Sequence, residues 1–393
     1  MNQKVLTIFL DGLKYNSLKY MPFLNSFRYK ARLKTLLGYS LTCHATMYTG
    51  VYPDKHNYWF VWKNSPHTSP FKKIVFLKYF PFCNILPIKL LIHKVITFFN
   101  RDNTSFFGIP KVVHLPVKYW NYIDVTEKKN YCEEKYIEKY PTIFDILRKE
   151  KIDFIVIGMD KSEKEESKIV RKYSFTSIPQ WSYLFMGDID HFSHTYLQDS
   201  KEGQRRLKKL DKLIELKYQE FSKNIKNFHF IVFSDHGHIP VHHRINIYDV
   251  YKKNKINLND FFHIIDVNFL RIWVNNKREK KILENILINN LKGFLIKSQE
   301  LEKYHLPKNN NEYGDIIFYL DAPYIFSNTI WGYSRKIISM HGYLPEYADS
   351  NGVFISNLPI KKKDVKLIDI LPSHLELLNV DIPGYVDGES VWS

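Results

Sequence analysis

Three short apolar runs, each followed within two residues by an aspartate, restrict the fold of this chain more than any other feature. The runs cover residues 5–10, 183–186 and 228–233, and the aspartates are Asp11, Asp188 and Asp235. Runs of this length that are rich in β-branched and aromatic residues are typical of strands buried on both faces. Helical patterns over residues 141–151 and 203–223, and a further apolar run over residues 154–157, lie between them. We therefore predict an α/β fold with a doubly wound, mostly parallel sheet.

The acidic residues that follow these strands indicate where a site would form. In open parallel sheets, ligands bind beyond the carboxyl ends of the strands. Asp11, Asp190 and Asp235 all fall at such ends, although they are far apart in the sequence. The sequence therefore predicts that acidic side chains gather at one edge of the sheet.

Two stretches lack this alternation, and we expect both to be insertions in one domain that spans residues 1–393. Residues 58–130 are predicted to form an inserted basic and aromatic cap. Residues 252–330 are predicted to form a smaller inserted sub-sheet, with strands at 267–274 and 316–320. The complete prediction is an α/β domain that carries cap insertions.

The first insertion has an unusual distribution of charge. From Lys55 to Arg101 there is no Asp or Glu, whereas eight residues are Lys or Arg, with Trp, Phe and Leu interleaved among them. Two interpretations stay open. The aromatic side chains could pack on the main domain while the lysines are solvated. Alternatively, residues 58–101 could make a peripheral membrane contact with anionic lipid.

The basic composition narrows the choice of partners. The chain has 57 Lys and Arg against 41 Asp and Glu, a formal net charge of +16. This charge suits a nucleic-acid binder, a membrane-surface binder or an enzyme that attracts anionic substrates. No specific nucleic-acid motif supports the first class, because the sequence has no zinc-finger spacing, RNP signature or basic-zipper heptads.

The expected location is the cytoplasm, with membrane association left open. The apolar run over residues 5–10 is too short for a secretory signal. No stretch reaches the roughly 18 uninterrupted apolar residues that a spanning helix needs. The three cysteines also argue against a disulfide framework, because their number is odd and no CxxC occurs.

Five motifs at the predicted strand ends and in the loops carry Asp, His and hydroxyl side chains. They are Asp11-Gly12, Ser40 before Thr49-Gly50-Val51-Tyr52-Pro53-Asp54-Lys55-His56, Asp190-His191-Phe192-Ser193-His194, Ser234-Asp235-His236-Gly237 and His341-Gly342-Tyr343. Carboxylates and imidazoles without thiolates suit Zn²⁺, and also Mn²⁺ or Fe²⁺. The motifs supply enough ligands for two metal ions, and a metal pair can clamp both oxygens of a phosphoryl displacement.

Each motif alone also has a simpler interpretation. Asp11 could end a strand in a turn, and Asp190 with His194 could be an exposed helical pair. Ser40 alone is indistinguishable from any loop serine. The five motifs in this order favour a two-metal site over these separate explanations.

In this order, the motifs resemble those of the alkaline phosphatase superfamily, and most closely its type I phosphodiesterase/nucleotide pyrophosphatase branch. The resemblance extends from Asp11 to about Gly388. It implies two divalent metal ions, with Zn²⁺ expected and Mn²⁺ as an alternative. One ion would be held by Asp11, Asp235, His236 and the nucleophile Ser40, and the other by Asp190, His194 and His341.

The chain departs from the pattern of that branch at several positions. Ser40 stands where the branch usually has Thr, Cys43 where an Asn is common, and Asn57 where a Gly is usual. We interpret the basic residues that follow Asp235-His236 as a solvated loop. These residues are His238, His242, His243 and Arg244.

The function implied by the resemblance is metal-dependent hydrolysis of a phosphodiester or pyrophosphate bond in an anionic substrate, through a phospho-serine intermediate. Two alternatives stay open. The chain could be a phosphomonoesterase on the same scaffold, which the serine nucleophile favours slightly. It could also be a catalytically inactive membrane-surface protein, although the ligand set is complete.

Overall fold

The computed structural model describes residues 3–99, 112–159, 166–257, 261–308, 311–333 and 336–392, and these form two compact units. The first unit consists of Met1–His56, Tyr131–Pro240 and Ile337–Ser393. The second consists of Asn57–Asn130 and Val241–Lys336. Among the described helices, none combines the length and the apolarity needed to cross a membrane.

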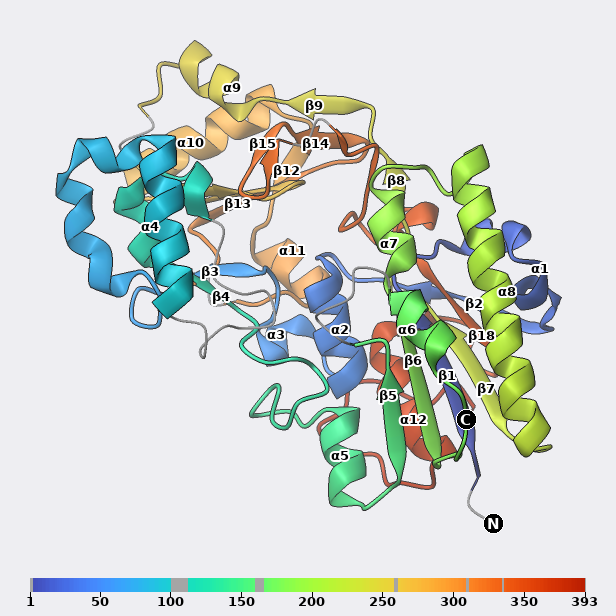
Figure 1. Ribbon diagram of the computed structural model, residues 1–393. Coiled ribbons are helices and arrows are strands. Elements are labelled where there is room, and N and C mark those ends of the chain that lie inside the picture. Colours follow the sequence, from blue (N-terminus) through green and yellow to red (C-terminus); the bar gives the residue numbers. More distant parts are fainter. Residues whose placement is uncertain are drawn as a thin grey trace. The chain divides into compact units, whose positions relative to one another are not determined.

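A seven-stranded sheet in the order β19-β2-β18-β7-β1-β6-β5 forms the centre of the first unit (Figure 1). Its strands are β1 Val5–Leu10, β2 Tyr29–Lys34, β5 Phe154–Ile157, β6 Trp181–Met186, β7 His229–Phe233, β18 Gly352–Ser356 and β19 Val365–Lys366. β5, β6, β1 and β7 are mutually parallel, whereas β18 is antiparallel to β7 and β2. The carboxyl ends of β6, β1 and β7 therefore lie side by side.

The central strands are buried on both faces, as their uninterrupted apolar sequences require. Because side chains alternate along a strand, Leu6, Ile8 and Leu10 of β1 enter one hydrophobic cluster together with apolar residues of helix α8 (Lys201–Asn224). Phe9 points to the opposite face, where its ring packs against His44 of helix α2 (Ser40–Thr49). The sheet is therefore the middle layer of an α/β sandwich.

Helices cover each face of this sheet. α8 and α1 (Pro22–Ser26) pack on one face. α2, α5 (Ile143–Lys149) and α12 (Ile370–Leu377) lie on the other, where the hydroxyl groups of Tyr48 and Tyr183 are 2.7 Å apart. The shorter elements of the unit are η1 Tyr15–Tyr20, α3 Pro53–His56, α6 Glu166–Lys172, α7 Asp188–Ser193, β8 Ile239–Pro240, β17 Ser339–Met340, η8 Ala348–Ser350 and η9 Leu367–Asp369.

The second unit contains a four-stranded antiparallel sheet in the order β10-β11-β13-β12. Its strands are β10 Phe262–Ile265, β11 Phe269–Trp273, β12 Gly293–Leu295 and β13 Ile316–Leu320. Helices α9 (Ile247–Lys253) and α10 (Lys277–Asn290) complete its hydrophobic core. The other elements are β3 Trp62–Asn64, η2 Lys72–Tyr79, η3 Pro81–Asn84, α4 Leu86–Phe99, η5 Val112–His114, η6 Val117–Tyr122, β4 Ile123–Val125, β9 His243–Ile245, α11 Ser298–Lys303, β14 Tyr324–Phe326, β15 Asn328–Thr329 and β16 Gly332–Tyr333.

The predicted fold class is confirmed, because a mostly parallel sheet lies between helical layers. The helix predicted over 203–223 is α8, which begins two residues earlier because the Ser200 hydroxyl accepts a hydrogen bond from the Gly203 amide at 3.1 Å. The strands predicted at 267–274 and 316–320 correspond to β11 and β13. The assignment of 58–130 as an inserted cap and 252–330 as an inserted sub-sheet stays a prediction.

Candidate metal centre

Three adjacent strands of the first unit bring acidic residues to one edge of the sheet. Asp11 follows β1 directly, Asp235 follows β7, and Asp190 lies in α7 after β6. The Asp190 amide donates a hydrogen bond to the Asp11 carbonyl at 3.0 Å, which joins two of these connections. Gly12 has φ +83°, and a Cβ there would lie 3.0 Å from the Asp190 Cα. Glycine is therefore needed where the two loops meet.

The first cluster of side chains consists of Asp11, Asp235 and His236. One ligand atom from each lies within 4.8 Å of the others. The His236 Nε2 is 3.3 Å from the Asp11 Oδ1 and 3.6 Å from the Asp235 Oδ2. The His236 Nδ1 donates to the Gly237 carbonyl at 3.1 Å, which leaves its Nε2 directed at the carboxylates.

Two residues of α2 border this first cluster. Ser40 is the first residue of α2, and its Oγ is 3.0 Å from the His236 Nε2. One turn further along, the His44 Nε2 lies 3.6 Å from the Asp235 Oδ2 and 3.8 Å from the Asp11 Oδ2. No role was predicted for His44, because nothing in the sequence around it indicates these distant carboxylates.

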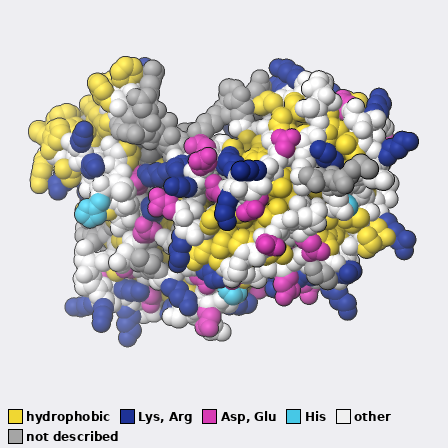
Figure 2. All heavy atoms as spheres, turned by 90° about the horizontal axis from the view of Figure 1, so that it is seen from below, with side chains coloured by type: hydrophobic (Ala, Val, Ile, Leu, Met, Phe, Trp, Pro, Cys, Tyr) yellow, Lys and Arg dark blue, Asp and Glu magenta, His cyan; other side chains and the backbone are white. Residues whose placement is uncertain are grey.

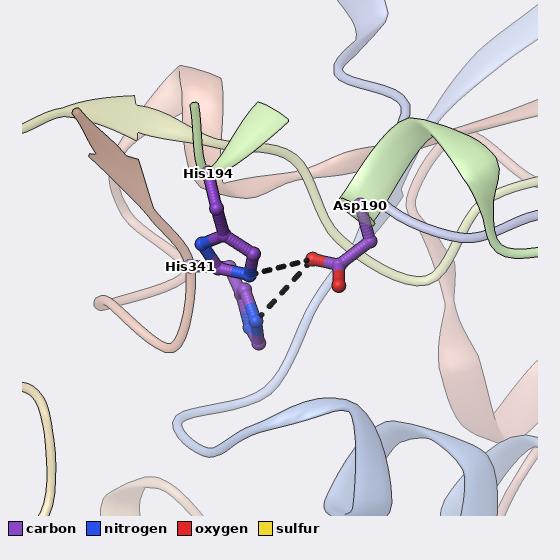
Figure 3. Close-up of side chains that lie close together, drawn as sticks. All are labelled: Asp190, His194 and His341. Atoms are coloured by element: carbon purple, nitrogen blue, oxygen red, sulfur yellow. Dashed lines mark ion pairs between the residues drawn. The ribbon is translucent and has the colours of Figure 1, made fainter. Parts of the chain in front are cut away.

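The second cluster consists of Asp190, His194 and His341. The Asp190 Oδ1 lies 3.3 Å from the His194 Nε2 and 3.5 Å from the His341 Nε2, so two imidazoles converge on one oxygen (Figure 3). The His194 Nδ1 donates to the Ser339 carbonyl at 3.2 Å, which directs its Nε2 towards Asp190. The strand pair β8–β17 places His341, the residue that follows β17, beside this cluster.

The two clusters are neighbours. The rings of His236 and His341, one from each cluster, stack with their centroids 4.0 Å apart and an angle of 8° between their planes. The structure therefore brings the seven residues selected from the sequence into one region of the first unit. These residues are Asp11, Ser40, Asp190, His194, Asp235, His236 and His341.

His238 corrects one interpretation made from the sequence. We interpreted it as part of a solvated basic loop, but its side chain is buried and its Nε2 is 2.9 Å from the Asp190 Oδ1. His242, His243 and Arg244 are exposed as expected, but His243 and Arg244 lie in strand β9 and not in a loop. The only local signal for His238 was its position two residues after His236, because Asp190 belongs to α7, far away in the sequence. His238 is therefore a residue of the second cluster.

Burial and charge set the protonation of these groups. Burial raises the pKa of Asp235, whereas the carboxylates of Asp235 and Asp11 overcome the effect of burial and raise the pKa of His236. Burial would also raise the pKa of Asp190, but His194 and His341 hold it well below its usual range. A cation would therefore have to displace a proton from His236 in the first cluster and from His194 in the second, whereas burial lowers the pKa of His341 and leaves that imidazole neutral.

The first cluster also contains polar atoms that lack hydrogen bonds. Both carboxylate oxygens of Asp235 and the Oδ1 of Asp11 are buried without a hydrogen bond of acceptable geometry. Leaving such atoms unsatisfied in a protein interior costs about 1–3 kcal/mol each, and more for a charged group. A divalent cation would satisfy them, and mixed Asp and His donors fit Zn²⁺ or Mn²⁺. Both clusters therefore have the donor chemistry of metal sites.

Cys43 occupies the position at which the type I phosphodiesterase/nucleotide pyrophosphatase pattern, which this sequence resembles, commonly has Asn. Its side chain is fully buried, and its Sγ lies 3.6 Å from the Thr35 Oγ1. Burial raises the pKa of this thiol well above its usual value. Cys43 is therefore a buried packing residue. A reactive thiol needs a lowered pKa, whereas the pKa of Cys43 is raised.

Comparison with known proteins identifies the class of protein to which this fold and site belong. A family model described as type I phosphodiesterase/nucleotide pyrophosphatase matches residues 5–344. A comparison with curated proteins finds no match. The sheet, the order of the motifs and this match define a phosphodiester hydrolase of the alkaline phosphatase superfamily. The chain belongs to the type I phosphodiesterase/nucleotide pyrophosphatase family.

Solved structures share this fold over nearly the whole chain. Human ectonucleotide pyrophosphatase/phosphodiesterase 5 matches with a TM-score of 0.68 and 15% identity, over 98% of this chain and 97% of that one. The murine protein matches with a TM-score of 0.66 and 15% identity, over 97% and 96% of the two chains. An inactive variant of the murine protein in complex with AMP gives 0.66 and 14%, with the same coverage. At these identities the likeness establishes the fold.

Proposed function

We propose that the protein is a two-metal hydrolase that cleaves a phosphodiester or pyrophosphate bond through a phospho-serine intermediate. The observation that carries the proposal is the position of Ser40. Its hydroxyl lies 3.0 Å from His236 and borders a cluster of two buried carboxylates, beside a second cluster of the same chemistry. Family membership supports the reaction class.

The two clusters divide the ligands between two ions. Asp11, Asp235 and His236, together with Ser40, would hold one ion. Asp190, His194 and His341 would hold the other, and His238 would orient the Asp190 carboxylate. When bound, two Zn²⁺ or Mn²⁺ ions supply positive charge that lowers the pKa of a nearby hydroxyl and stabilises phosphoryl oxygens.

Ser40 performs the substitution at phosphorus. Its Oγ loses its proton and forms a bond to phosphorus while the bond from phosphorus to the leaving oxygen breaks. The leaving oxygen takes up one proton, so the number of protons is unchanged. Water subsequently cleaves the phospho-serine and restores the hydroxyl. Because Ser40 begins α2, its phosphoryl group would also meet the amide end of that helix, which favours negative charge.

The substrate we propose is a nucleotide phosphate ester. The murine relative with AMP bound shares the fold, and the net charge of +16 favours an anionic ligand. A phosphomonoester is the alternative substrate on the same scaffold. Comparing turnover of bis-p-nitrophenyl phosphate with that of p-nitrophenyl phosphate distinguishes the two, and a clear preference for the monoester would overturn the diesterase assignment.

The decisive experiment is hydrolysis of bis-p-nitrophenyl phosphate by metal-stripped protein resupplied with Zn²⁺ or Mn²⁺. We expect turnover only with metal, and we expect Ser40→Ala and Asp235→Ala each to lower kcat by roughly three orders of magnitude or more. Ser26→Ala is the matched control, because this exposed serine donates only to the Phe23 carbonyl in its own helix. Metal-dependent turnover that survives in Ser40→Ala would exclude the phospho-serine route.

A further inference from the structure

The second unit exposes an unusual number of large apolar side chains in one segment. Twelve of the nineteen such side chains in the described part of the chain lie between residues 75 and 99. Ten of them belong to η2, η3 and α4, and Phe80 and Ile85 lie at the junctions between these elements. η3 contacts both η2 and α4. Figure 2 shows hydrophobic side chains gathered at the left of that view, over the segment drawn blue to cyan in Figure 1. We call this surface, residues 72–99, the apolar segment.

Helix α4 carries apolar residues on two opposite faces. On its inner face, Ile96 is buried and the His93 ring packs against Phe71 and Trp120. Its outer face presents Leu91, Val95 and Phe99, spaced four residues apart, and these side chains are 61%, 45% and 78% exposed. Such a helix is already anchored to its own unit by one face, and packing among the described residues of this unit does not account for the other face.

The charge of the apolar segment is of one sign. Between Lys55 and Phe99 the chain has no Asp or Glu. Lys72, Lys73, Lys78 and Lys94 are exposed among the apolar side chains. A surface of this composition attracts a negatively charged partner by its lysines and removes its aromatic and aliphatic side chains from water on contact.

We propose that the apolar segment docks the protein on an anionic lipid surface, with Leu91, Val95 and Phe99 entering the bilayer interface. Aromatic and leucine side chains flanked by lysines are what interfacial segments use, since the lysines reach the headgroups while the apolar side chains enter the acyl boundary. A protein partner fits less well, because the cores of protein–protein interfaces are depleted in lysine. Peripheral attachment also needs no spanning helix.

Vesicle flotation tests this proposal with the full-length protein. We expect the protein to float with vesicles of equal parts phosphatidylcholine and phosphatidylglycerol, and weakly with phosphatidylcholine alone. The combined change Leu91→Ser, Val95→Ser and Phe99→Ser should lower the bound fraction by roughly tenfold or more. Lys72→Glu, Lys73→Glu and Lys78→Glu together should do the same, with a greater effect at low salt.

Two controls separate this effect from damage to the fold and from catalysis. The combined change Leu216→Ser, Ile282→Ser and Ile288→Ser alters apolar residues outside the segment that are 43%, 45% and 51% exposed, and this variant should bind vesicles like the original protein. Ser40→Ala should also bind vesicles normally, because docking does not depend on the proposed hydrolysis. The apolar triple variant should hydrolyse a soluble diester as the original protein does.

Three results would overturn the proposal. The first is unchanged flotation of the variant altered at Leu91, Val95 and Phe99. The second is equal binding of the original protein to both kinds of vesicle, which would remove the role given to the lysines. The third is that the original protein forms a dimer in sedimentation equilibrium, that this dimer does not bind vesicles, and that the variant no longer forms it. That result would assign the apolar segment to a second copy of the chain.

Discussion

At the residue scale, His238 provides the sharpest test of how the second cluster is held. Its Nε2 is 2.9 Å from the Asp190 Oδ1, and a carboxylate oriented by such a hydrogen bond binds metal more tightly. We expect His238→Ala to weaken the second ion by about 10- to 100-fold. Competition with a chromophoric chelator, together with metal analysis of the dialysed protein, measures this loss without reference to activity.

Two further variants make the His238 result interpretable. His238→Gln offers an amide that can also donate to Asp190 and should recover part of the affinity, which a purely space-filling role would not produce. His242→Ala removes an exposed histidine four residues away and should leave both ions bound. Two tightly held ions in His238→Ala would show that Asp190 needs no orientation by this side chain.

Individual residues also show where sequence reasoning ended. Asp11 and Asp235 could be predicted because each follows an apolar strand, and the end of a strand fixes the position of the next side chain. The role of His238 could not be predicted, because it depends on a contact with Asp190, which is 48 residues away in the sequence. A hydrogen bond from the Asp190 amide to the Asp11 carbonyl holds α7 against the segment that follows β1. The polar residues around His238 favoured a solvent-exposed side chain, but the hydrogen bond to Asp190 holds this side chain in the protein interior.

At the element scale, the end of α2 should be sensitive to a single methyl group. Gly50 closes this helix with φ +69°, and a Cβ there would lie 2.9 Å from the Val386 Cγ1 and 3.0 Å from the Leu371 Cδ2. A left-handed conformation and this crowding should together make Gly50→Ala destabilising by about 2 kcal/mol. Urea unfolding followed by circular dichroism measures the change.

The control for this substitution is Gly384→Ala. No atom lies within 4 Å of the position of its added Cβ, and we expect a change in the free energy of unfolding of less than about 0.5 kcal/mol. If both alanine variants unfold at the same urea concentration, Gly50 would not be required to end α2. Because α2 begins at Ser40, a shift of this helix should also reduce turnover.

The strands that could be predicted from the sequence are mainly those that are buried on both faces of the sheet. β1 and β7 lie within one residue of the predicted runs, because a strand covered on both faces is apolar throughout. The edge strand β5 also matches its predicted run, although its residues are only partly buried. β2 was not predicted, since half of the residues in Tyr29–Lys34 are basic and only one of its residues is buried. Its place near the edge of the sheet, beside β18 and the short β19, explains this composition.

At the scale of the whole molecule, the sequence predicted the layers but not the order of the strands. β18 lies between β7 and β2 and is antiparallel to both, and no periodicity indicates where a late strand inserts. The second unit is likewise assembled from two segments, Asn57–Asn130 and Val241–Lys336, which are separated in the sequence by 110 residues of the first unit. Apolar patterns define elements, whereas contacts between distant segments define the assembly.

Metal binding should stabilise the whole first unit, because its ligands come from the loops after β1, β6 and β7 and from the segment after β17. An ion present at about 1,000 times its Kd adds about 4 kcal/mol to the free energy of unfolding when the unfolded chain does not bind it. We therefore expect Zn²⁺ to raise the Tm of metal-stripped protein and a chelator to reverse the rise. Asp235→Ala should lose the part of this response that comes from the first ion, whereas Asp199→Ala, at an exposed aspartate, should keep the full response.

The same stabilisation should depend on pH in a defined direction. Neighbouring carboxylates raise the pKa of His236 and of His194 against the effect of burial, so both imidazoles hold protons that a metal ion must displace. As the pH falls through neutrality, protons compete more strongly with Zn²⁺ for the imidazole nitrogens, so the rise in Tm on adding Zn²⁺ should become smaller. Calorimetry across this range, with and without Zn²⁺, measures the effect. A rise in Tm that is constant with pH would mean that Zn²⁺ binds without displacing protons. His236 and His194 would then not be metal ligands.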